Sequence, residues 1–136
     1  MINKLLFLVL LIIQLGSEVL SAQDSLVIEI SGIKSDTGFI MLQLLDENQE
    51  VIGQDKGIIK DKKSTIVFSF LKPGKYAVRY YHDENLSGKM ETNSFGMPEE
   101  GYGFSNDAYG LFGPKSFSEW LFEFNDDKKI ILKIKY

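Results

Sequence analysis

A run of oxygen-bearing side chains between Asp83 and Glu91 is the part of this sequence most suited to binding an ion. Oxygen side chains stand at alternate positions of this run, and Gly88 occupies the sixth position. The spacing matches the start of a calcium-binding loop, in which glycine permits a sharp turn and a backbone carbonyl completes the ligands. Hard oxygen donors without a nitrogen or sulfur cluster favour calcium. The predicted ligands are Asp83, Asn85, Ser87, the backbone carbonyl of Lys89, and Glu91.

A simpler interpretation of the same residues stays open. Ser94 stands where a calcium-binding EF-hand places its bidentate glutamate, and only Asp83 and Glu91 bring negative charge to the pattern. The alternative is a glycine turn held by Asx hydrogen bonds from Asp83 and Asn85. Calcium, if bound, would be weak and structural, and no other cofactor is expected. Further ligands would have to fold back from elsewhere, namely from Glu99, Glu100 or Asp107.

The second candidate site is a group of aromatic residues in the long glycine-rich segment 83–116. We predict an ordered excursion here, because the segment is too apolar for disorder and shows no convincing strand. Its rings could form a shallow platform for a glycan or a peptide. The alternative is that they pack under their own loop as a small satellite core. The residues of the predicted ligand surface are Tyr102, Phe104, Asn106, Tyr109 and Phe112.

The remaining chemistry is mostly excluded by what the sequence lacks. There is no cysteine and only one histidine, His82, so thiol nucleophiles, redox pairs and multi-histidine zinc sites drop out. The adjacent carboxylates 99–100 and 126–127 point apart in extended chain, whereas glycoside hydrolysis needs two carboxyls facing each other. We therefore predict no catalytic residues and a non-enzymatic protein. The alternative is a hydrolase or carbohydrate-processing enzyme with its site in 83–116.

The elements that must position these residues show the alternation of half-buried strands. Apolar side chains recur at every second position, with turn residues between the runs. Two packed antiparallel sheets of six to seven strands, an immunoglobulin-like sandwich, would bury those faces. Lysines on the outer face of the last run suit a sheet edge. The expected strands are 26–30, 40–44, 57–59, 64–71, 75–82, 117–124 and 130–136.

Two stretches of sequence resemble known proteins. The run LKPGKYAV (71–78) resembles the turn and strand of transthyretin-like and carboxypeptidase-regulatory-like sandwiches. The segment HDENLSGKMETNSFGMPEEGYGFSNDAYGLFGPKSF (82–117) resembles a family of exported bacterial proteins catalogued as domain of unknown function 2141. This resemblance implies export and a β-sandwich, but no substrate, reaction or catalytic residue. Members of that family commonly carry an acidic residue at the position of Ser87 and aspartate at that of Glu91.

The N-terminal residues 1–22 have the pattern of a secretory signal. Lys4 precedes an apolar stretch at 5–15, and the small residues Ser21 and Ala22 offer a cleavage site. The stretch is too short to span a bilayer, which takes about 20 apolar residues. The alternative is an uncleaved N-terminal anchor. We expect an exported chain, whether periplasmic, outer-membrane-associated or secreted, whose single domain is 23–136.

Charge and composition limit the partners. The net charge of −4 and the pI near 5.0 argue against nucleic acid, which requires a clustered basic face. Without cysteine, the exported domain must be stable without disulfides. No transmembrane segment is expected after signal removal. The predicted partner is an envelope protein or a glycan, and the oligomeric state stays open.

Overall fold

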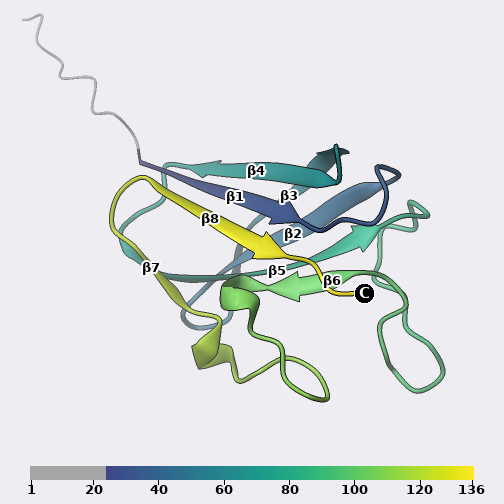
Figure 1. Ribbon diagram of the computed structural model, residues 1–136. Coiled ribbons are helices and arrows are strands. Elements are labelled where there is room, and N and C mark those ends of the chain that lie inside the picture. The colour runs from purple at the N-terminus through teal and green to yellow at the C-terminus, as the bar shows by residue number, and fades with distance from the viewer. Residues whose placement is uncertain (1–23) are drawn as a thin grey trace, which may run out of the picture.

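Strands dominate the computed structural model, which describes residues 24–136; the expected signal segment 1–22 lies outside this range. Its helical elements are two 3₁₀ turns, η1 (Ser105–Asp107) and η2 (Phe117–Glu119) (Figure 1). The all-β prediction is confirmed, with eight strands in the described range where six to seven were expected. They are β1 Ser25–Ser31, β2 Phe39–Asp46, β3 Val51–Lys60, β4 Lys63–Ser69, β5 Gly74–Asp83, β6 Tyr102–Phe104, β7 Phe122–Phe124 and β8 Lys128–Lys133.

The strands form one continuous path that nearly closes on itself. Their order is β6-β5-β2-β3-β4-β1-β8, and β7 pairs with the start of β5. β3 joins the two halves, because its first part pairs with β2 and its end pairs with β4. On the other side, Tyr102 of β6 bridges Lys135, which follows β8. β8 thus lies at one end of the strand order, where its lysines predicted an edge.

The prediction of purely antiparallel pairing is wrong for one pair. β1 and β8 run parallel, with Leu26 opposite Lys128. The chain leaves β7 and reaches β8 at the end of the sheet where β1 also begins. There the backbone N–H of Ser25 donates to a carboxylate oxygen of Asp127 over 2.7 Å. Two strands that start together at one end must run in the same direction.

The core lies between the two halves of the sheet and is built as the alternation predicts. Along β1 and β2, buried side chains alternate with half-buried ones that point outward. The other strands contribute in the same way, so one apolar cluster joins all but β6. Its members are Leu26, Ile28, Ile30, Ile33, Ile40, Leu42, Leu44, Ile59, Ile66, Tyr76, Val78, Tyr80, Phe122, Phe124, Leu132 and Ile134.

Two strands differ from the sequence prediction. β3 is ten residues long, although only its end was expected, because most of its side chains are exposed and its apolar alternation is weak. β6 lies inside the segment expected to lack strands. Gly103 allows it, since a Cβ at this position would collide with the ring of Tyr80 on the neighbouring strand. Trp120, expected in the core, is half-buried with its ring 4.3 Å from that of Phe104.

His82, at the end of β5, is fully buried and ties four segments together. Its Nε2 lies 2.6 Å from the carbonyl of Thr37, so this nitrogen carries the proton. Nδ1 then accepts the phenol proton of Tyr136 over 2.7 Å, and the same phenol oxygen accepts the N–H of Lys34. The backbone N–H of His82 donates to the carbonyl of Gly101. Each of these bonds fixes one segment against the end of β5.

Replacing Tyr136 with phenylalanine tests this tie. The substitution leaves Nδ1 of buried His82 without a donor, so we expect a loss of about 1–3 kcal/mol in the free energy of unfolding. Urea denaturation measures the loss. Tyr81→Phe is the control, because the hydroxyl of Tyr81 makes no hydrogen bond within the described residues. Equal stability of the two variants would contradict the role given to Tyr136.

Candidate functional site

The segment predicted to bind calcium is a turn held by its own hydrogen bonds. The two carboxylate oxygens of Asp83 accept the backbone N–H groups of Ser87 and Gly88, each over 2.9 Å. Asn85 accepts the same Ser87 N–H over 3.2 Å and donates to the Glu91 carboxylate over 2.8 Å. Ser87 Oγ donates to the carbonyl of Lys89. The predicted ligands are therefore brought together, but they bind one another.

These contacts favour the Asx turn over a metal loop. The carbonyl of Lys89 and the oxygens of Asp83 and Asn85 already accept hydrogen bonds from within the segment. Within residues 24–136, no three His, Cys, Asp or Glu side chains gather closely enough to hold an ion. Calcium binding at Asp83, Asn85, Ser87, Lys89 and Glu91 stays a prediction that a titration can test.

A second carboxylate, Glu100, lies buried beneath this turn. One of its oxygens accepts the backbone N–H of Glu91, and the other has no hydrogen-bond partner within the described chain. Burial raises the pKa of Glu100, and the nearby charges of Asp83 and Glu91 raise it further. Its neighbour Glu99 is exposed, so the two adjacent carboxylates point apart, one to the interior and one to the surface.

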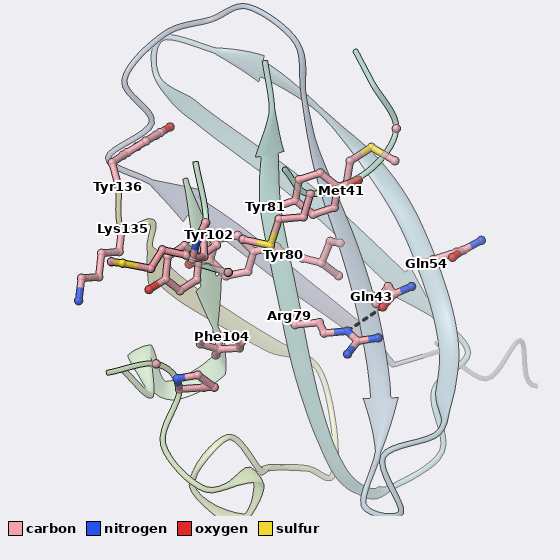
Figure 2. A pocket seen from close by; sticks show the side chains of 18 of the residues that line it. Met41, Gln43, Gln54, Arg79, Tyr80, Tyr81, Tyr102, Phe104, Lys135 and Tyr136 are labelled. Carbon is pink, nitrogen blue, oxygen red and sulfur yellow. Dashed lines mark hydrogen bonds between the residues drawn. The ribbon is translucent and has the colours of Figure 1, made fainter. Parts of the chain in front are cut away.

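A groove of about 1280 Å³ opens on the outer face of β3, β2, β5 and β6. Two cross-strand rows of side chains floor it, because residues opposite one another in the register share this face. One row consists of Gln54, Gln43, Arg79 and Phe104, and the next consists of Lys56, Met41, Tyr81 and Tyr102. Figure 2 shows Met41 and Tyr81 close together above the strands, and Arg79 joined to Gln43.

Two loops form the sides of this interloop groove. The first loop, 88–98, contributes Phe95 and Met97, and the second loop, 111–114, contributes Leu111 and Phe112. These four side chains are between 62% and 102% exposed, although all are large and apolar. Figure 1 shows both loops extending from the β5–β6 region on the same side of the molecule. The loops thus present apolar side chains around a partly polar floor.

The residues predicted as a ligand surface are divided between two roles. Tyr102, Phe104 and Phe112 line the interloop groove. Asn106 instead donates to the carbonyls of Glu119 and Leu121. Tyr109 packs edge-on against Tyr102 and Phe104 while its hydroxyl lies within bonding distance of the carbonyls of Tyr102 and Lys133. Burial raises the pKa of Tyr109 to about 12, so this phenol keeps its proton at neutral pH. Three of the five residues thus border the open groove and two bond to neighbouring segments, while ligand binding here stays a prediction.

The electrostatics of the groove are opposite in sign to those of the whole chain. Lys56, Arg79 and Lys135 line it together with one acidic residue, Asp55, whereas the chain carries −4 overall. None of these three cations forms an ion pair with another described residue. The Nε of Arg79 donates to Gln43 over 2.7 Å, which fixes the guanidinium and leaves its two terminal nitrogens for a ligand.

A comparison with protein families shows which family this chain belongs to. The profile of an uncharacterized family conserved in bacteria, DUF2141, matches residues 28–131. The chain belongs to this family. The match spans every strand except the ends of β1 and β8, so this DUF2141 domain includes the turn, the groove floor and both loops. No curated protein and no solved structure matches the chain.

Sequence reasoning missed most of the groove of this DUF2141 chain. Met41, Gln43, Arg79 and Tyr81 alternate with core residues, so their outward direction was readable from the pattern. Their gathering under two loops was not, because it depends on how β6 returns beside β5. The apolar tips at Phe95 and Leu111 carry a signal, since such residues are unusual on exposed loops.

Asp83→Ala tests the hydrogen-bonded turn. Loss of two bonds to a carboxylate should lower the free energy of unfolding by about 1–3 kcal/mol, with Asp126→Ala, in an exposed turn, as the control.

We expect about 1 mM calcium, the range of weak extracellular sites, to leave the melting temperature of the unaltered protein unchanged. A clear rise in that temperature, abolished by Asp83→Ala, would favour the metal loop instead.

Glu100→Gln tests the buried carboxylate through pH. Because folding raises the pKa of Glu100, the folded state binds more protons than the unfolded state above pH 4.5, its ordinary value. The contribution of Glu100 to stability therefore falls as pH rises through this window. When the free energy of unfolding is measured from about pH 4 to pH 7, the stability of Glu100→Gln relative to the unaltered protein should increase with pH. Glu99→Gln is the exposed control, and parallel curves for both variants would rule out the effect.

Proposed function

We propose that this DUF2141 chain is an exported, non-enzymatic binding module of the bacterial envelope that holds its ligand in the interloop groove. The observation that carries the proposal is the set of four exposed apolar side chains around a sheet face. Large apolar side chains gathered on a surface mark sites where another molecule covers them. Here they surround a groove lined also by Arg79 and Tyr81, which supply polar contacts.

A hydrolase that used a histidine would depend on His82, the one histidine in the sequence, and both ring nitrogens of His82 are bonded inside the protein. The nearest carboxylate, that of Glu84, is 3.8 Å from Nδ1 and is paired with Lys34. Burial opposes ionisation of Glu84, but hydrogen bonds from Lys34 and Ser35 outweigh it and lower its pKa. These groups serve the fold at the end of β5.

Two further parts of the proposal rest on the sequence. Export is supported by the signal pattern at 1–22. Separately, no helix within residues 24–136 is long and apolar enough to cross a bilayer. An immunoglobulin-like, transthyretin-like sandwich is supported by the turn at Pro73-Gly74 and by the two strand groups that enclose the core. The envelope partner is a protein or a glycan.

Site-specific photocrosslinking in the native host tests the proposal. A photoreactive phenylalanine at position 112 should give a discrete adduct in cells, because a ligand in the groove covers this tip. Phe70 is the matched control, since it is 72% exposed and lies outside the groove lining. Met97→Ser should reduce the adduct at position 112. Equal labelling from positions 70 and 112, or none from either, would contradict a groove-bound ligand.

A further inference from the structure

We propose that the ligand of the interloop groove is an extended polypeptide segment carrying both carboxylate and apolar side chains. This inference rests on the proposed function and specifies its ligand class. It follows from three properties of the groove: unpaired cations on its floor, exposed apolar side chains along its sides, and a width that spans several strands.

The cations call for more than one negative group. Lys56 and Lys135 stand at opposite ends of one cross-strand row, which passes over β3, β2, β5 and β6 to the chain after β8. Neighbouring strands are spaced about 4.8 Å apart, so the row spans about 19 Å. Arg79 lies between these ends in the adjacent row, its terminal nitrogens free to bind a carboxylate in bidentate fashion. Lys56 and Lys135 contact the aromatic rings of Phe39 and Tyr109 but have no anionic partner, so a ligand with a single charged group would leave two of the three cations without one.

The sides of the groove select against a purely polar ligand. Met97 and Leu111 are aliphatic in shape, and together with Phe95 and Phe112 they offer contact to apolar side chains. A glycan stacks on aromatic rings and gains little from exposed aliphatic groups. An acidic polysaccharide would therefore match the cations and the two phenylalanine tips, but not Met97 and Leu111. Alternating acidic and apolar side chains along one peptide match both.

The dimensions and shape fit an extended chain. The volume exceeds the range of about 300–1,000 Å³ that is usual for small-molecule pockets. At about 3.3 Å per residue, about six residues of extended peptide would cross the row. A lipid surface would touch the loop tips but not the concave floor between them, so Arg79 and Gln43 would make no contact. Free hydrogen-bonding groups on Gln43 and Gln54 also suit a peptide backbone.

Selection from a random dodecapeptide display library tests the ligand class, with the mature chain immobilised. The selected peptides should be enriched in acidic and large apolar residues together. Their dissociation constants are then measured by fluorescence anisotropy. Arg79→Gln should weaken binding at least about tenfold, the loss expected for a charge-assisted hydrogen bond. Lys60→Gln, which removes the same charge from an exposed position outside the groove lining, should leave the constant within about twofold.

Each other outcome overturns the inference in a recognisable way. If the selected peptides are neutral or basic, or if Arg79→Gln binds them with unchanged affinity, the ligand is not acidic. The proposed function would still hold in that case if Phe112→Ser abolishes peptide binding. Binding of polygalacturonate or of anionic phospholipid vesicles with displacement of the peptide would assign the groove to a glycan or a membrane. The proposed function would be contradicted as well if two results came together. No selected peptide would lose affinity when groove residues are substituted, and no crosslinked adduct would form at position 112.

Discussion

A buried imidazole must have both ring nitrogens bonded, and at His82 this requirement organises one end of the molecule. A neutral ring has one donor and one acceptor, so it needs a carbonyl on one side and a hydroxyl on the other. The turn before β2 supplies the carbonyl of Thr37, and the chain beyond β8 supplies the phenol of Tyr136. The backbone N–H of the same residue fixes Gly101 at the approach to β6. Segments far apart in the sequence are thereby held at the point where β5 leaves the sheet.

The groove depends on this anchoring. The segment that carries the first loop leaves β5 after His82, is held internally by Asp83 and returns to the sheet at Gly101. Because both ends are fixed, the loop can carry exposed apolar tips without collapsing onto the strands. Asn106 and Tyr109 hold the second loop in the same way, through backbone carbonyls of neighbouring segments. Two loops held by such polar contacts can leave the sheet face between them open, with its cations free of ion pairs.

Alternation in the sequence predicted the all-β class, most strands and the core, since burial on one face requires an apolar residue at every second position. It could not predict the first part of β3, whose residues Gln54 and Lys56 are exposed and whose pairing comes from the neighbouring strands. Nor could it place Glu100 beneath the turn or predict the parallel pairing of β8, because both depend on contacts between distant segments. The hydrogen-bonded turn at Asp83 was readable from the sequence as an alternative to a calcium loop, and its hydrogen bonds are present in the structure, while calcium binding stays a prediction. The groove was predicted only in part, since Tyr102 and Phe104 were named as a possible ligand surface but the side chains of β2 and β5 that form its floor were not.

The pairing of β1 with β8 would affect how the protein reaches its final state after the proposed export across a membrane. Ile28 lies opposite Ile130, so the first strand stays incomplete on one side until the last has been delivered. Contacts this distant in sequence close late and slow the search for the native topology. A chain exported from its N-terminus onward would keep a long apolar strand edge uncovered during passage. Such an edge is prone to aggregation, so protection by chaperones in the receiving compartment would matter most at that stage.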